Sequence, residues 1–151
     1  MVLFISSLFY ILFRIFSCFE IGSENIIKHI GRTDPDIPNN IFYNFLYRAR
    51  EAGITVPIIA GIMPITSPKQ LTRSAAMSGT DVPSRFRAIV DYFGTDTEAM
   101  TQAGIVYASE QIIDLIANGI RHIHVYTMNK PDVAGRIMKN LSKILWDGDH
   151  A

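Results

Sequence analysis

The sequence predicts an α/β fold in which parallel strands alternate with helices. Two apolar segments carry this prediction: residues 54–64 (ITVPIIAGIMP) and residues 123–130 (IHVYTMNK). Each has the composition of a buried strand, ends in a polar or Gly/Pro turn and leads directly into a helical pattern. Units of this kind build parallel sheets, in which functional groups collect at the carboxyl ends of the strands.

The length and charge of the chain limit the classes of protein to which it can belong. Its 151 residues allow one domain with a sizeable core. The 14 basic and 14 acidic side chains balance, so charge gives no reason to expect a nucleic-acid partner. Cys18 is the single cysteine, which excludes an intrachain disulfide framework and a cysteine-based zinc site. We therefore expect a reducing compartment, the cytoplasm.

Residues 2–19 differ from the rest, being rich in Phe, Ile, Leu and Ser around a single charge, Arg14. A secretory signal is a poor match, because no basic residue precedes the apolar run and no A-x-A-like site follows it. A membrane anchor has about the right length, although Arg14 would cost about 2.5–3.5 kcal/mol near the bilayer centre. We prefer a third interpretation, in which residues 1–38 are foreign to the following fold, for instance translated non-coding DNA. A core helix or a targeting segment is a further alternative.

These patterns predict three parts of the chain. Residues 31–40 contain two prolines and no apolar period, which is typical of a linker. We therefore expect an unrelated apolar segment and linker over residues 1–38, a folded part over residues 39–146 and a tail over residues 147–151.

The folded part is predicted to begin with a helix that Asn39 or Asn40 can cap. Its apolar stripe recurs at spacings of three and four residues: Ile41, Phe42, Phe45, Leu46, Ala49 and Ala52. Gly53 follows as the residue that ends the helix.

The first strand, residues 55–63, is apolar on both faces and therefore predicts a strand covered on both sides, as in a barrel or a doubly wound sheet. Pro57 withholds a hydrogen-bond donor, so we expect it at the first turn of the strand or opposite a bulge. Gly61 permits close approach of backbone or ligand, and Pro64 closes the strand.

Two short helices are predicted next. Residues 67–70 (SPKQ) form a capping box with proline at the first helical position, and this helix runs to about Met77. Pro83 opens the second helix, which Gly94 stops.

Thr95 and Glu98 are predicted to form a second capping box, at the start of a long helix that ends at Asn118 and is capped by Gly119. Residues 120–128 then form the second strand, and residues 131–145 the closing helix. Because a helical crossover joins the two strands, they should be parallel, with a right-handed connection.

Two groups of polar residues are candidates for chemical sites. His122 and His124 alternate along a strand and could supply two metal ligands, but the sequence offers no evident third ligand, so we expect strand histidines and no metal site. Asp91, Asp96 and Glu98 are explained by the preference of helix starts for acidic residues. The chain also contains no G-x-G-x-x-G, P-loop or G-x-S-x-G motif.

The strand ends are the remaining candidates for a site. Residues 61–64 and 126–130 place backbone groups, an aromatic hydroxyl and a cation at one rim of the predicted sheet. This combination favours an anionic, flat ligand.

From about residue 40 to residue 145 the chain resembles the C-terminal part of the methylenetetrahydrofolate reductase family. The matching pieces are 48–56 (RAREAGITV), 57–64 (PIIAGIMP), Lys69-Gln70, Val82-Pro83, Gly104-Ile105 and 124–130 (HVYTMNK). Members of this family fold as (β/α)8 TIM barrels that hold FAD. They reduce 5,10-methylenetetrahydrofolate to 5-methyltetrahydrofolate, with hydride passed from NADH or NADPH through the flavin, and many are homo-oligomers.

The resemblance implies that this chain holds the last two strands of such a barrel and part of its folate site. Tyr126, Met128 and Lys130 fall where the last strand of the family contacts the substrate. The family usually has arginine at the position of Lys130, and a lysine keeps the charge but loses the bidentate fork. Met128 replaces a leucine. The resemblance assigns no catalytic and no cofactor-binding residue to this chain.

The chain also lacks features that the family has. The catalytic acid, the flavin contacts and a Gln-Phe-Phe-Phe strand of the family all lie upstream of Asn40, and residues 34–37 read DPDI where that strand is expected. A closed barrel needs eight strands and about 250 residues. We therefore expect a truncated chain that neither holds FAD nor catalyses the reaction alone. The alternative is a non-catalytic fragment or interaction module, anchored to a membrane through residues 2–19 in one version.

Overall fold

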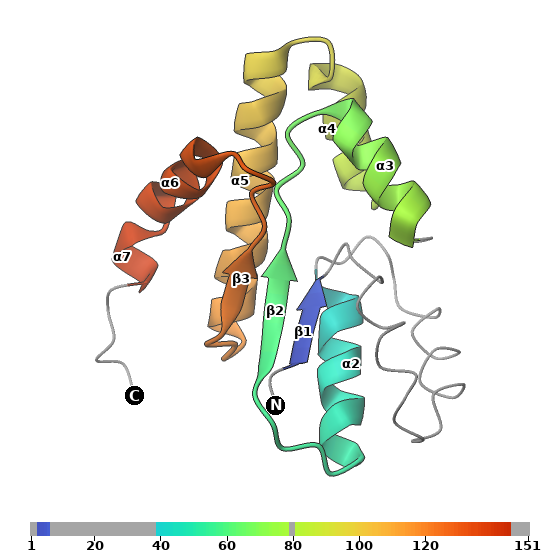
Figure 1. Cartoon of the computed structure of the whole chain (residues 1–151), viewed down its shortest axis with the longest axis vertical. Coiled ribbons are helices and arrows are strands. Elements are labelled where there is room, and N and C mark those ends of the chain that lie inside the picture. Colours follow the sequence, from blue (N-terminus) through green and yellow to red (C-terminus); the bar gives the residue numbers. More distant parts are fainter. Residues whose placement is uncertain (1–2, 7–38, 79–80, 146–151) are drawn as a thin grey trace.

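The structure, a computed structural model, describes residues 3–6, 39–78 and 81–145 as a parallel sheet with helices (Figure 1). The elements in chain order are β1 (Leu3–Ser6), α2 (Asn40–Glu51), β2 (Ile58–Ile62), α3 (Pro68–Ser78), α4 (Ser84–Phe93), α5 (Thr97–Ala117), β3 (Ile123–Val125), α6 (Pro131–Asn140) and α7 (Ser142–Leu145). The predicted α/β class is therefore confirmed. Residues 31–38 of the predicted linker and the predicted tail lie outside the described residues, whereas Asn40, the last residue of that linker, begins α2.

The sheet has the order β1-β2-β3, and both pairings are parallel. Ala60 pairs with Ile123 across β2 and β3, which confirms the parallel arrangement of the two predicted strands. β1 is a third strand that the sequence did not predict, with Leu3 paired with Ile58. The predicted anchor, residues 2–19, lies outside the described residues except for β1. Among the helices that the structure describes, none is both long and apolar enough to cross a membrane.

Both predicted strands are shorter than expected, for local reasons. Pro57 directly precedes β2 and offers no backbone N–H to a neighbouring strand. After β3 the backbone turns through Met128 (φ 49°) and Asn129 (φ 65°), a left-handed conformation that no strand can continue. The turn brings the end of β3 towards the start of α6.

The predicted helix ends at Gly53 and Gly119 are confirmed, with φ values of 78° and 81°. The Gly53 N–H donates to the Arg50 carbonyl at 3.0 Å, and the Ile54 N–H donates to the Ala49 carbonyl at 2.9 Å. This is the Schellman pattern, which satisfies the last carbonyls of a helix, and it recurs at Gly119.

Two predicted helix starts are wrong in detail. Asp96, and not the pair Thr95 and Glu98, caps α5, because its carboxylate accepts from the backbone N–H groups of Glu98 and Ala99 at 2.9 and 3.0 Å. Asn39 stands at the N-cap of α2, but its side chain makes no capping bond. The predicted closing helix is also divided, with α6 ending before Leu141 and α7 beginning after it.

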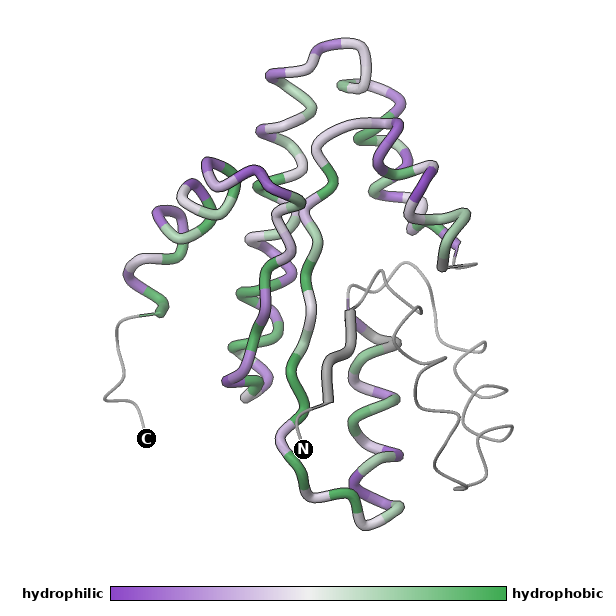
Figure 2. The backbone as a smooth tube through the Cα atoms, in the orientation of Figure 1, coloured by the Kyte–Doolittle hydropathy of each residue, from purple (hydrophilic) through white to green (hydrophobic). Residues whose placement is uncertain are grey.

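The core consists of two clusters of buried side chains. The first joins one face of β2 to α2, α5 and α6, and its largest buried members are Phe42, Ile62, Ile105, Leu115, Ile137 and Leu141. Alternate residues Ile58, Ala60 and Ile62 belong to it, as the period of a strand requires. The second lies beyond the carboxyl end of β2, under α3, α4 and α5, and contains Met63, Ile65, Leu71, Phe86, Val90, Met100 and Tyr107. Figure 2 shows the hydrophobic course of β2.

A polar cluster ties the start of α2 to α5. The Asp114 carboxylate accepts from the Tyr43 hydroxyl and from the Asn39 side-chain amide, both at 2.8 Å. The same amide also donates to the Gln111 carbonyl at 3.0 Å. This tertiary role explains why the Asn39 side chain does not cap its own helix.

The cluster predicts a loss of stability at alkaline pH. Burial, followed by the hydrogen bond to Asp114 and the charge of that carboxylate, raises the pKa of Tyr43 above its ordinary value of about 10. Because the pKa of Tyr43 is higher in the folded chain than in the unfolded chain, its protonated hydroxyl contributes to the free energy of unfolding. This contribution is complete below about pH 10 and is lost as the pH rises above that value. Urea unfolding should show that the free energy of unfolding falls between pH 8 and pH 11, and that this fall is smaller in the Tyr43→Phe variant. The exposed Tyr92 gives the control: Tyr92→Phe should leave the fall unchanged, and equal curves for wild type and Tyr43→Phe would contradict the assignment.

Candidate functional site

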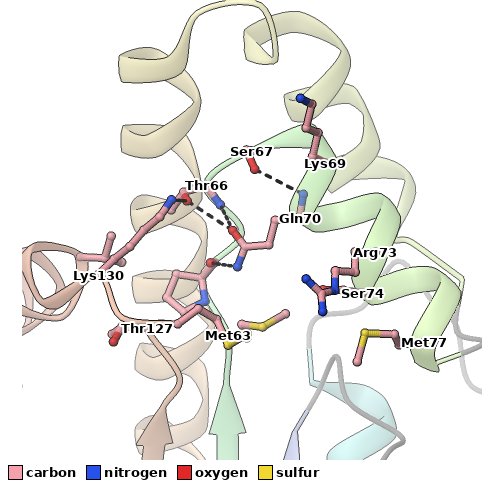
Figure 3. Close-up of a pocket in the computed structure, with 13 residues that line it drawn as sticks. Met63, Thr66, Ser67, Lys69, Gln70, Arg73, Ser74, Met77, Thr127 and Lys130 are labelled. Carbon is pink, nitrogen blue, oxygen red and sulfur yellow. Dashed lines mark hydrogen bonds between the residues drawn. The ribbon is translucent and has the colours of Figure 1, made fainter.

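A cavity of about 320 Å³ opens at the carboxyl ends of β2 and β3, between α3 and the start of α6 (Figure 3). Its lining comes from the segment after β2, from α3 and from the segment after β3: Met63, Pro64, Thr66, Ser67, Lys69, Gln70, Arg73, Ser74, Met77, Thr127, Met128, Lys130 and Val133. This volume is at the lower end of the range for small-molecule sites. The cavity therefore lies at the edge of the sheet where the sequence predicted a site.

The start of α3 sets the first side of the cavity. The Ser67 hydroxyl accepts from the Gln70 N–H at 3.3 Å, which is one arm of the predicted capping box. The other arm reaches one residue further back, because the Gln70 side-chain oxygen accepts from the Thr66 N–H at 3.1 Å. Helical spacing then places Gln70, Arg73, Ser74 and Met77 on one side of α3.

The Gln70 amide is held at both of its ends. Its Oε1 accepts from the Thr66 N–H and from the Thr66 hydroxyl, the latter at 3.3 Å, and its Nε2 donates to the Pro64 carbonyl at 3.1 Å. If the amide were flipped, its NH2 group would face the Thr66 N–H, which is also a donor, and its oxygen would face the Pro64 carbonyl, which is also an acceptor. The bonds therefore fix which end of Gln70 is the donor.

Lys130 connects the two strand ends. The turn through Met128 and Asn129 closes with the Lys130 N–H donating to the Thr127 carbonyl at 3.0 Å. From there the Lys130 ammonium donates to the Thr66 hydroxyl at 2.9 Å. A continuous chain of bonds therefore runs from Lys130 through Thr66 to Gln70.

The charge of the lining is positive. Lys69, Arg73 and Lys130 contribute three cations, and the lining residues that the structure describes include no aspartate or glutamate. In Figure 3 the Arg73 guanidinium points from α3 into the cavity, whereas Lys69 points away from Gln70. The arrangement suits an anionic ligand, as the strand ends predicted.

The structure brings together two of the three residues that the sequence analysis assigned to substrate. Lys130 and Met128 line the cavity, and the Met128 side chain is 63% exposed. Tyr126 is not among the lining residues. It is half-buried, packs against the second core cluster and lies edge-on to the His124 ring, with centroids 4.4 Å apart.

Four further polar residues of the lining were not predicted as members of a site: Thr66, Gln70, Arg73 and Ser74. Ser74 is buried, with 3% of its surface exposed, and Thr66 with 2%. The available signal was the polar face of the helix after the first strand, but a polar helix face usually faces solvent. The polar face of α3 becomes a wall of the cavity because the turn after β3 places Lys130 opposite it, bonded to Thr66.

The other polar candidates lie outside the cavity. His122 and His124 are exposed and do not line it. Asp96 has its capping role, and Asp91 and Glu98 are exposed. Within residues 3–6, 39–78 and 81–145, no group of three or more His, Cys, Asp and Glu side chains is placed to hold a metal ion.

Comparison with known proteins identifies relatives of the described part of the chain. The sequence model of the family described as "Methylenetetrahydrofolate reductase" matches residues 37–142. "Methylenetetrahydrofolate reductase (NADH) 1" of Zea mays is 37% identical over 105 residues, which are 70% of this chain and 18% of that protein. "Methylenetetrahydrofolate reductase 1" of Schizosaccharomyces pombe is 34% identical over 106 residues, 70% of this chain and 17% of that protein.

A bacterial relative gives the same match. "5,10-methylenetetrahydrofolate reductase" of Escherichia coli is 29% identical over 100 residues, 66% of this chain and 34% of that protein. The chain thus spans between 17% and 34% of the length of these three relatives. The match includes both strand ends and the whole lining of the cavity. The chain belongs to the methylenetetrahydrofolate reductase family.

Proposed function

We propose that this chain supplies part of the folate site of a methylenetetrahydrofolate reductase, at the carboxyl rim of a (β/α)8 barrel. The reaction is the reduction of 5,10-methylenetetrahydrofolate to 5-methyltetrahydrofolate with FAD and with NADH or NADPH as the donor. The observation that carries the proposal is the cationic cavity at the ends of β2 and β3, which fits the place of ligands in parallel α/β folds. Family membership supplies the reaction.

Each wall of the cavity has a role in this proposal. Lys130 and Arg73 attract the carboxylates of a folate, since both are cations at the cavity. Gln70 offers an oriented amide donor. Met63 and Met128 provide polarisable apolar surface for a flat ring. Tyr126 packs against the core cluster that contains Met63, and its contact with the substrate stays a prediction.

The described residues do not fit FAD. A cavity of about 320 Å³ is small for a dinucleotide, and its one-sided cationic lining suits a single anionic arm of a ligand. We therefore assign no flavin contact and no redox step to this part of the chain. In this proposal its own residues bind the substrate and orient it. Tyr126, Met128 and Lys130 as substrate contacts, a cytoplasmic location and homo-oligomers stay predictions.

Lys130 provides the test of this proposal. Lys130→Met should weaken the binding of 5-methyltetrahydrofolate to the full chain about tenfold or more, because a hydrogen bond to a charged group is worth about 1.5–3 kcal/mol. Lys130→Arg should restore or tighten binding, because the planar fork suits a carboxylate. Isothermal titration calorimetry measures both.

The control is Lys139→Met, which removes an exposed cation of α6 that does not line the cavity. This variant should bind like wild type, so a general effect of net charge is separated from an effect of the site. Wild-type affinity in Lys130→Met, or no binding of 5-methyltetrahydrofolate by the unaltered chain, would contradict the proposal. The latter result would favour the alternative of a non-catalytic interaction module.

A further inference from the structure

Thr66 occupies the centre of the polar network beside the cavity. Only 2% of its surface is exposed, yet it makes three hydrogen bonds to side chains of the cavity wall. Its hydroxyl accepts from the Lys130 ammonium at 2.9 Å, and both its hydroxyl and its N–H contact the Gln70 oxygen. No other residue of the described lining is bonded to both of these side chains.

The direction of each bond follows from the donors available. An ammonium group can only donate, so the Thr66 hydroxyl must accept from Lys130 and direct its single proton to Gln70 Oε1. Gln70 Oε1 then has two donors, and Nε2 has spent one of its two hydrogens on the Pro64 carbonyl. The second Nε2 hydrogen and two ammonium hydrogens of Lys130 have no acceptor among the described side chains of the cavity wall, so they can bind a ligand.

We propose that Thr66 is a positioning residue, which fixes Lys130 and Gln70 so that both offer N–H donors to one carboxylate of the ligand. This inference rests on the proposed folate function for the identity of the ligand. Lys130 is the side chain that gains most from being held, because it has a flexible four-carbon stem and makes its bond across 64 residues of chain. Without the hydroxyl, a ligand would have to order this stem at the moment of binding.

Two substitutions separate the hydroxyl from the shape of the side chain. Thr66→Val keeps the volume and the backbone N–H but removes the bond to Lys130, whereas Thr66→Ser keeps the hydroxyl. We expect Thr66→Val to weaken binding of 5-methyltetrahydrofolate about 3- to 10-fold, the cost of ordering one long side chain, and Thr66→Ser to bind like wild type.

A double-mutant cycle distinguishes positioning from a structural role. Thr66→Val should have a smaller effect on affinity in a Lys130→Met background, where only its bond to Gln70 is still lost, so the two changes are not additive. Equal losses in both backgrounds would overturn the inference, as would loss of binding in Thr66→Ser. Circular dichroism establishes that each variant is folded before its affinity is compared.

A measurement without ligand tests the anchor independently of the proposed function. The order parameter of the Lys130 Cε–H bonds, from ¹³C relaxation, should be high in wild type and Thr66→Ser and should fall in Thr66→Val. Unchanged mobility of Lys130 in Thr66→Val would refute the positioning role even if folate binds. A chain that shows the anchoring but binds no 5-methyltetrahydrofolate would instead refute the proposed function and the carboxylate as the ligand, and leave Thr66 as an anchor alone.

Discussion

Replacing Gly104 by alanine is expected to lower the free energy of unfolding by about 3 kcal/mol, the upper part of the range for overpacked cores. Gly104 is buried inside α5, where the helix passes the chain after β2. A Cβ there would overlap the Ile65 carbonyl oxygen and would lie 2.9 Å from the carbonyl carbon of the same residue. These are backbone atoms, so the contact cannot be relieved by a change of rotamer.

The sign of this prediction is opposite to that of helix propensity. In an open helix, glycine is about 1 kcal/mol less favourable than alanine, so alanine normally stabilises. Gly135 provides the matched control, because it lies in α6 with nothing within 4 Å of a Cβ. Urea unfolding should show Gly104→Ala less stable and Gly135→Ala more stable than wild type. A Gly104→Ala variant as stable as wild type would show that α5 does not approach Ile65 this closely.

The Gly104 contact also concerns the cavity. The added Cβ would lie 3.6 Å from the Thr66 Cα, so relief of the overlap moves α5 relative to the segment that carries Thr66. Because Thr66 is bonded to both Lys130 and Gln70, a displaced backbone would disturb donors on both walls. Gly104→Ala should therefore also weaken ligand binding at temperatures where the variant is still folded.

Local signals predicted the parts of the fold that depend on local chemistry. Gly53 and Gly119 end their helices as expected, because a left-handed residue after a helix needs only its own conformational freedom. The apolar composition of β2 likewise predicted a buried strand in a parallel pair. Asn39 shows the limit of such signals. Asparagine is a good capping residue, but the Asn39 side chain is bonded instead to Gln111 and Asp114, more than seventy residues away in the chain.

The site could be predicted only in part for the same physical reason. The position of Lys130 after a strand placed it at the correct rim, and its pairing with Thr66 confirms that the two strand ends meet there. The resemblance assigned Tyr126 to the substrate, and this assignment stays a prediction: Tyr126 follows the end of β3 at Val125 and packs against the core. Thr66 and Gln70 depend on a contact that no single stretch of sequence contains.

Replacing Asp114 by alanine is expected to destabilise the chain by about 2–3 kcal/mol, because hydrogen bonds to a charged group contribute about 1.5–3 kcal/mol. Its carboxylate is the shared acceptor for Tyr43 and Asn39, each at 2.8 Å. Asn39 is buried, with 5% of its surface exposed, and its side-chain oxygen already has no partner among the described residues. Loss of the carboxylate would leave one further buried group poorly satisfied and loosen the start of α2.

Glu110→Ala is the control for this prediction, because Glu110 lies one turn earlier on α5 and is paired with Arg85 at 2.8 Å on the surface. Both side chains of that pair are about half exposed, so its loss should cost no more than about 1 kcal/mol. Both variants place alanine in the same helix, so the difference in free energy of unfolding between Asp114→Ala and Glu110→Ala reports the buried cluster. Equal stabilities would mean that Asp114 holds α2 no more firmly than a surface ion pair does. A difference that disappears in a Tyr43→Phe, Asn39→Ala background would assign the effect to the bonds from Tyr43 and Asn39.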